Sequence, residues 1–347
     1  MNADIFLWLA QDGVTNGAIY ALLALALLLV FAVTRVIFVP QGEFITFAAL
    51  SLALLEAGRT PGTLWILVIG GLAAAAMEAF GALRERAWHR LPRIAALYVL
   101  LPLAVAALVA WAAPRKLDQW VQVLIVLGLV VPLGPILYRV AYQPLAGASV
   151  LVLFIVSMAA HYTLSGLGLV FFGSEGLRSQ PFSDAQFTFG VLNVSAQSLW
   201  VLFASLVVMA ALWLLFDRTL YGKALRATAI NRVGARLVGI PTELSGSLSF
   251  TLAAFIGTVS GILISPITTI YYDTGFLIGL KGFVGAILGG MGSYPLAALG
   301  AAALGLLESF SSFWASVFKE VIVFTLIIPV LVWRSLTSIH HVEDEEQ

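Results

Sequence analysis

The chain alternates between long apolar segments and short polar connections. Its apolar segments, each bounded by charged residues, proline or glycine, fall at about residues 14–34, 44–57, 63–83, 94–113, 119–138, 149–170, 197–216, 245–265, 276–290, 294–310 and 319–334. As a helix the first would be about 31 Å long, enough to cross the hydrocarbon core of a bilayer. The pattern predicts an all-α bundle of transmembrane helices, with about nine to eleven helical elements in a single domain over residues 1–347.

Two of the apolar segments are too short to cross. As helices, residues 44–57 and 276–290 would be about 21 and 22 Å long. Each is therefore expected to be a half-helix or a broken helix whose loose backbone is buried in protein or faces a water-filled path. Two Gly-interrupted short segments, one in each half of the chain, are typical of a transport pathway.

Composition supports the membrane assignment and narrows the function. Hydrophobic residues make up 61 % of the 347 residues, charged residues 10 %, and the formal net charge is zero; the mean hydropathy is +1.01. Without a basic tract, nucleic-acid binding has no electrostatic basis. The chain has no cysteine, which excludes disulfides and thiolate metal sites. The H-E-x-x-H, G-x-S-x-G and Walker A patterns are also missing, so we expect neither an enzyme nor a cofactor in this chain.

Basic residues indicate the orientation. If the segments alternate, Arg35, Arg139, Arg334 and the clusters at residues 84–93 and 218–236 share one side. The positive-inside rule makes that side cytoplasmic, which places the N-terminus outside and the acidic tail, residues 340–347, inside. Residues 1–12 carry no Lys or Arg ahead of a long apolar run, so we expect the first helix to be retained.

The inner polar connection, residues 217–245, has a helical pattern of its own. Between Gly222 and Gly239 there is no proline and the apolar residues recur at helical spacing, until Pro241 stops the helix. One interpretation is an amphipathic helix held by its arginines to anionic lipid of the inner leaflet. The other is a docking helix for a cytosolic partner. The sequence leaves both open.

Polar residues inside the apolar segments are costly and need an explanation. Glu43 opens a short segment after Val39-Pro40-Gln41-Gly42, where it either favours the positive end of the helix or lines a solute path. Lys281, in the other short segment, either forms an ion pair or snorkels, or it faces the path. Asn16 and Tyr20, four residues apart in the first helix, either face that path or bond to a neighbouring helix.

Several stretches carry a family resemblance. They are residues 13–22, 34–37 and 41–44 in the first part, Ala141-Tyr142-Gln143-Pro144-Leu145, residues 222–227 with 237–240, and residues 279–283 with 286–293. These stretches resemble the permease subunits of ABC importers for branched-chain amino acids, a family with relatives for urea and short amides. Together they cover both ends and most of the chain.

The resemblance implies partners and a mechanism. A second permease subunit, two cytosolic ABC ATPases that hold ATP and Mg, and an extracytoplasmic solute-binding protein would surround this chain in a bacterial inner membrane, and solute would cross by alternating access. The substrate-pathway residues would be Asn16, Tyr20, Gln41, Gly42, Glu43 and Lys281. The ATPase-docking residues, within residues 217–245, would be Gly222, Lys223, Arg226, Asn231, Arg232, Arg236 and Gly239.

The chain also departs from the family pattern. Residues 84–138 form what looks like an inserted helical hairpin, and Ile230 stands where an acidic residue is common, which leaves Asn231 and the arginines for polar contact with an ATPase. The solute stays open between leucine-like amino acids, urea and amides. The alternative function is a secondary transporter driven by an ion gradient, which the lack of clustered intramembrane carboxylates disfavours.

Overall fold

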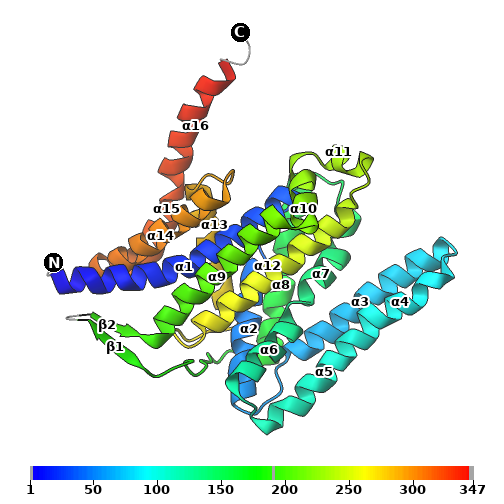
Figure 1. Ribbon diagram of the computed structural model, residues 1–347, viewed down its shortest axis with the longest axis horizontal. Coiled ribbons are helices and arrows are strands. Elements are labelled where there is room, and N and C mark those ends of the chain that lie inside the picture. Colours follow the sequence, from blue (N-terminus) through cyan, green and yellow to red (C-terminus); the bar gives the residue numbers. More distant parts are fainter. Residues whose placement is uncertain (1–2, 190–191, 344–347) are drawn as a thin grey trace.

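The protein is a bundle of long helices in the computed structural model, which describes residues 3–189 and 192–343 (Figure 1). The first half contains α1 (Ala3–Thr34), α2 (Gln41–Glu56), α3 (Thr63–Arg84), α4 (Leu91–Ala95), α5 (Leu101–Ala112), α6 (Gln119–Val130), α7 (Leu133–Leu137) and α8 (Val150–Phe172). The second half contains α9 (Ala196–Arg218), α10 (Leu220–Ile230), α11 (Arg232–Leu237), α12 (Thr242–Ile264), α13 (Thr274–Leu288), α14 (Tyr294–Trp314), α15 (Lys319–Thr325) and α16 (Ile327–Glu343). Short 3-10 or π turns are η1 (Trp88–Arg90), η2 (Ala96–Leu100), η3 (Ala113–Arg115), η4 (Tyr138–Tyr142), η5 (Gln143–Leu145) and η6 (Ser316–Phe318).

Within the described residues, nine helical stretches are long and apolar enough to cross a bilayer. They are Asp4–Thr34, Thr63–Arg84, Trp88–Arg115, Gln119–Leu145, Val150–Phe172, Ala196–Arg218, Thr242–Ile264, Tyr294–Trp314 and Ser316–Trp333. The predicted all-α polytopic fold is confirmed. The two predicted short segments are also present, as α2 with 16 residues and α13 with 15.

Helix α1 runs through the core of the bundle. Every residue from 19 to 30 is buried, as expected for a helix that is apolar on all sides. Helix α14 lies against it where two glycines meet: a Cβ on Gly305 would stand 2.4 Å from the Cα of Gly17. Small residues on both helices therefore allow them to pack closely at this point.

Two local features go beyond what the sequence predicted. Helix α1 begins at Ala3, ahead of the apolar run that starts near residue 14, and Ser309 Oγ donates to the carboxylate of Asp12 in this first part at 3.3 Å. The connection between α8 and α9 contains a hairpin in which β1 (Gln186–Phe189) pairs antiparallel with β2 (Leu192–Ser195). Ser195 then caps α9, since its Oγ accepts from the backbone N–H of Ser198 at 3.1 Å.

Residues 84–138, expected to form a helical hairpin, contain helices on both sides of a short turn; α4 and α5 lie beside α3, whereas α6 packs mainly against α2 (Figure 1). The two stretches, Trp88–Arg115 and Gln119–Leu145, are joined by this turn. Asp118 in that turn starts α6 by accepting from the backbone N–H of Trp120 at 3.2 Å. That the hairpin is an insertion relative to the family stays a prediction. At the other end of the chain, α16 extends to Glu343, and residues 344–347 of the acidic tail lie outside the described residues.

Candidate functional site

Helix α2 begins halfway through the bundle. Gln41, its first residue, donates from Nε2 to the backbone carbonyl of Ala253 at 3.0 Å. Ala253 lies at the midpoint of α12 (Thr242–Ile264), and His161, the partner of Glu43, lies at the midpoint of α8 (Val150–Phe172). Because both long helices are met at their centres, α2 is a half-helix that starts near the middle of the membrane-spanning layer.

The local sequence explains this start. Helix α1 ends at Thr34, and Arg35 adopts a left-handed φ of 60°, which breaks the helix. Residues 35–38 have no regular structure, and Pro40 takes the N-cap position of α2 with a φ of −67°. The chain thus turns back inside the bundle, as the Pro40-Gln41-Gly42 break predicted.

The start of α13 meets the start of α2. A Cβ on Gly42 would lie 2.1 Å from the carbonyl oxygen of Gly275, and a Cβ on Gly275 would lie 2.1 Å from the carbonyl oxygen of Gly42. The backbone N–H of Gly275 donates to Thr46 Oγ1 at 3.0 Å. Two short helices therefore cross at their N-terminal ends, the arrangement found at the binding sites of many transporters.

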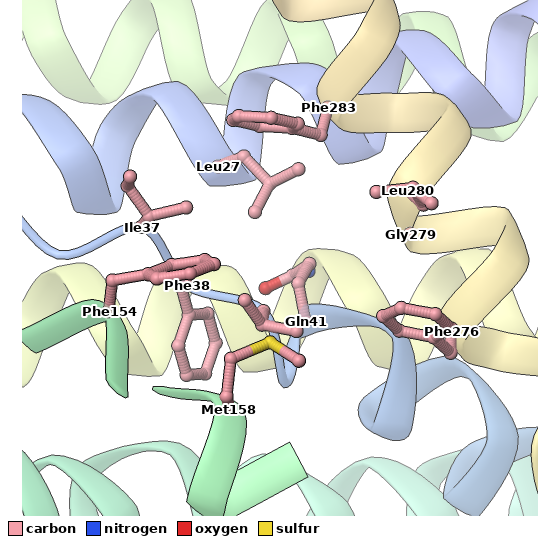
Figure 2. Close-up of a pocket in the computed structure, with 11 residues that line it drawn as sticks. Leu27, Ile37, Phe38, Gln41, Phe154, Met158, Phe276, Gly279, Leu280 and Phe283 are labelled. Carbon is pink, nitrogen blue, oxygen red and sulfur yellow. The ribbon is translucent and has the colours of Figure 1, made fainter. Parts of the chain in front are cut away.

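A cavity of about 280 Å³ lies beside this crossing. Figure 2 shows its walls, which come from α1, the irregular segment, α2, α8 and α13. The lining residues are Leu27, Ile37, Phe38, Val39, Gln41, Phe154, Met158, Phe276, Gly279, Leu280 and Phe283. All are apolar or glycine except Gln41, so among the described residues this amide is the single polar side chain on the wall.

Gln41 presents an unused acceptor. It is 0 % exposed, and while Nε2 bonds to Ala253, Oε1 has no hydrogen-bond partner among the described residues. In Figure 2 its side chain lies between Phe38 and Phe276 and points toward the space that the lining residues enclose. A buried acceptor without a donor is uncommon in a folded protein and calls for an explanation, such as a ligand or a water.

Glu43 is close to the cavity in the sequence of α2 but is not among the residues that line it. Its Oε1 lies 2.6 Å from His161 Nδ1, and both residues are buried. The ring of His161 stacks on Phe276, with 4.3 Å between the centroids. Sequence analysis placed Glu43 in the first turn of α2, which is confirmed, but it missed His161. The only available signal was an isolated histidine in an apolar helix, one turn from the cavity residue Met158.

The other predicted pathway residues lie elsewhere. Lys281 Nζ donates to Glu308 Oε1 at 2.6 Å and to Glu320 Oε1 at 3.1 Å, and Tyr20 Oη donates to Glu308 Oε2 at 2.6 Å. Asn16 Nδ2 donates to Asp12 at 3.4 Å. This network joins α1, α13, α14 and α15 and shares no residue with the cavity wall. The structure therefore does not gather the predicted pathway residues in one place, and a transport role for this group stays a prediction.

The predicted docking segment folds as two helices instead of one. Asn231 breaks the helix between α10 and α11, and its Oδ1 accepts from the backbone N–H of Gly234 at 2.8 Å. Thr219 starts α10 in the same way, by accepting from the N–H of Gly222 at 3.0 Å. Gly239, after α11, has a φ of +87°. Asn231 thus has a structural role as an N-cap, and Gly222 has one because a Cβ there would lie 2.1 Å from the carbonyl oxygen of Leu215.

The arginines of this segment bond to their own chain. Arg226 donates to the carbonyl of Phe216, Arg232 to that of Ala146 at 3.0 Å, and Arg236 to Thr242 Oγ1 at 3.2 Å. Several large apolar side chains of this segment are also highly exposed. We call these the apolar stripe: Ile230 (82 % exposed), Val233 (70 %), Leu237 (83 %) and Val238 (77 %). Lys223, near the start of α10, is exposed as well.

Comparison with known proteins agrees with this architecture. The family model described as the branched-chain amino acid transport system / permease component matches residues 94–331. The chain is 25 % identical, over 345 aligned positions covering 95 % of this chain and 94 % of the relative, to the high-affinity branched-chain amino acid transport system permease protein LivH of Escherichia coli K12. It is 30 % identical over 203 residues, 56 % of this chain and 66 % of the relative, to the permease protein BraD of Pseudomonas aeruginosa. A probable branched-chain amino acid transport permease of Methanocaldococcus jannaschii is 32 % identical over 200 residues, 55 % of this chain and 62 % of that relative. The chain belongs to the family of branched-chain amino acid transport system permeases.

Proposed function

We propose that this chain is a membrane-spanning subunit of an ATP-driven importer, and that a branched-chain amino acid crosses the membrane through the cavity where α2 and α13 meet. The observation that carries the proposal is the crossing itself. Two half-helices start at mid-depth, touch at Gly42 and Gly275, and border an apolar cavity of about 280 Å³. The solute named for the relatives, an amino acid with an aliphatic side chain, suits such a cavity.

The mechanism is conformational. In this proposal two cytosolic ATPases hold ATP and Mg, because the chain has no P-loop sequence of its own. A closed ATPase pair favours one conformation of the permease and an open pair favours the other, so that the cavity opens alternately to the two sides. A second permease subunit and an extracytoplasmic solute-binding protein complete the assembly.

The apolar stripe is the proposed contact with the ATPase. Ile230, Val233 and Leu237 lie on the two short helices α10 and α11 and are each at least 70 % exposed. Helices with an exposed apolar face are a common ligand of grooves in partner proteins. The intrachain bonds of Arg226, Arg232 and Arg236 hold the segment on the bundle, so it can transmit a movement as a rigid unit.

The proposed orientation places α10 and α11 in the cytoplasm of a bacterial cell, the N-terminus outside and the C-terminus inside. The basic segments support it because they meet on one side of the bundle. Arg139 pairs with Glu78 at the end of α3, and Gln143 bonds to Glu243 at 3.0 Å beside α11. The positive-inside rule favours placing this side, with Arg35 and the arginines at residues 84–93, in the cytoplasm.

Reconstitution tests the proposal. The permease would be placed in proteoliposomes with its partner permease, both ATPases and the binding protein, and uptake of radiolabelled leucine would be measured. We expect uptake that requires ATP, is blocked by vanadate and survives an uncoupler. Uptake by this chain alone without nucleotide, or uptake abolished by the uncoupler and indifferent to vanadate, would instead support a carrier driven by an ion gradient.

A further inference from the structure

We infer that Gln41 recognises the amino group of the solute through Oε1, while the aliphatic part of the solute fills the apolar cavity. The inference rests on the proposed function and assigns the individual contacts within it. It begins from the geometry of one amide group: Nε2 of Gln41 is held by the carbonyl of Ala253, and Oε1 is buried with no partner among the residues described.

The orientation of this amide follows from its surroundings. The carbonyl oxygen of Ala253 only accepts hydrogen bonds, so the side of the amide that faces it must be the NH₂ group. The oxygen is therefore fixed on the other side. Because the bond to Ala253 fixes the amide, Oε1 is already oriented to accept a hydrogen bond. A solute with an ammonium or amide N–H group can donate that bond.

The rest of the wall selects for apolar bulk. Leu27, Met158, Leu280 and Phe283 line the same cavity as the amide, and no second polar side chain of the described part of the chain lines it. Its volume of about 280 Å³ is slightly below the range of about 300–1,000 Å³ that is usual for ligand pockets. The cavity therefore has room for one small aliphatic group, and a solute such as urea would leave most of the apolar wall without a contact.

The carboxylate of an amino acid also has a suitable environment. Gln41 is the first residue of α2, and Phe276 and Gly279 belong to the first turns of α13, so the cavity adjoins the N-terminal ends of both helices. These ends carry a partial positive charge. The ammonium and carboxylate groups share one carbon atom, so both can lie at the crossing while the side chain points into the cavity.

Binding measurements test the assignment. The assembled permease complex in nanodiscs would be titrated with radiolabelled leucine, in competition with 4-methylpentanoate, which is leucine without its amino group. We expect the native complex to prefer leucine, and the Gln41→Met variant to bind leucine about tenfold more weakly, equivalent to about 1.4 kcal/mol. Binding of 4-methylpentanoate should change little, because it makes no bond to Oε1.

A matched glutamine provides the control. Gln122 on α6 is also buried, donates from Nε2 to a backbone carbonyl and has an unpartnered Oε1, but it does not line the cavity. Gln122→Met should leave leucine binding unchanged. The inference is overturned if the Gln41→Met variant retains the native affinity for leucine, or if its affinities for leucine and for 4-methylpentanoate fall by the same factor.

A second variant covers the case in which Gln41→Met does not fold. Met158→Phe enlarges a wall residue and should weaken the binding of leucine more than the binding of the smaller amino acid alanine. Met209→Phe on α9, which lies outside this cavity, should change the binding of neither amino acid. Equal effects of the two methionine variants on leucine would overturn the placement of the solute. If the native complex shows no ATP-driven uptake of leucine, the proposed function is contradicted. If the native complex transports leucine but the Gln41→Met and Met158→Phe variants bind leucine as tightly as the native complex does, only this inference is contradicted.

Discussion

Glu43 and His161 form a buried pair at mid-depth in the bundle, with 2.6 Å between Oε1 and Nδ1. Their side chains are 1 % and 7 % exposed. The pair ties the first turn of α2 to the centre of α8, the helix that contributes Phe154 and Met158 to the cavity wall. It therefore holds that wall at a fixed distance from Gln41, without itself lining the cavity.

Replacing His161 with phenylalanine should destabilise the protein. Oε2 of Glu43 already has no partner in the described structure, so the variant leaves the whole carboxylate buried without a hydrogen bond from a side chain. Breaking a buried pair in this way costs about 3–5 kcal/mol. The measurement is the melting temperature of the purified chain in detergent, and an unchanged value would show that the pair contributes no stability.

Glu43→Gln separates a structural role from a transport role. The glutamine keeps an oxygen that can accept from His161 and removes only the charge, whose interaction with the end of α2 is worth about 0.3–1 kcal/mol. We therefore expect a melting temperature close to that of the native protein and leucine uptake that retains its concentration dependence. Uptake lost at an unchanged melting temperature would place Glu43 in the solute path.

The sequence predicted the half-helices but not what they contact. Pro40, Gly42 and the length of each apolar run are local signals, and they were sufficient to predict α2 and α13. The pairing of Glu43 with His161 joins residues 118 positions apart. No local pattern specifies such a contact, because it depends on how α2 and α8 pack. For the same reason the separation of Lys281 from the cavity could not be predicted.

Lys281→Met should also destabilise the fold. Lys281 is the cation between Glu308 and Glu320, and it is 6 % exposed. Without it, the two carboxylates keep Tyr20 as their single donor among the described residues. We therefore expect the free energy of unfolding to fall by about 3 kcal/mol, as for other broken buried pairs. The double variant Lys281→Met/Glu308→Gln should recover part of that loss, which a double-mutant cycle on melting temperatures would measure.

An exposed ion pair is the matched control for this cycle. Arg90 and Glu85 lie 3.2 Å apart, with side chains 60 % and 66 % exposed. Such surface pairs contribute little, so Arg90→Met should change the melting temperature only slightly. If Lys281→Met lowers the melting temperature no more than Arg90→Met does, the buried network does not hold α1, α13 and α14 together.

The docking segment shows where helical periodicity gives incomplete information. The spacing of apolar residues between 222 and 239 predicted a helix, and most of that range is helical. Periodicity does not say which face packs on the bundle. Here the buried face uses Leu225 and Ala235, and Ile230 and Val233 remain exposed. The break at Asn231 was missed because asparagine is a frequent N-cap but is also tolerated within helices.

Charged substitutions in the apolar stripe should uncouple the ATPases. Ile230→Asp and Val233→Asp place a carboxylate in a contact that the proposal treats as apolar. Because both residues are at least 70 % exposed, we expect the isolated chain to tolerate either substitution. We expect an unchanged melting temperature, loss of co-purifying ATPase and loss of uptake. Arg226→Gln should retain more ATPase, because Arg226 bonds to Phe216 of its own chain. Full ATPase recovery with Ile230→Asp would rule out the stripe as the contact.

Enlarging Gly275 should disrupt the crossing of the two half-helices. A Cβ there would lie 2.1 Å from the carbonyl oxygen of Gly42 and 2.3 Å from Thr46 Oγ1, so even alanine forces the helix starts apart. Overpacking of this kind costs about 1–3 kcal/mol. We expect Gly275→Ala to lower the melting temperature and to weaken leucine binding, since the displaced backbone borders the cavity. Gly166→Ala on α8 is the control: a Cβ there meets nothing within 4 Å, and alanine favours a helix over glycine by about 0.5–1 kcal/mol. Equal melting temperatures for the two variants would mean that α2 and α13 are not in contact at Gly42 and Gly275.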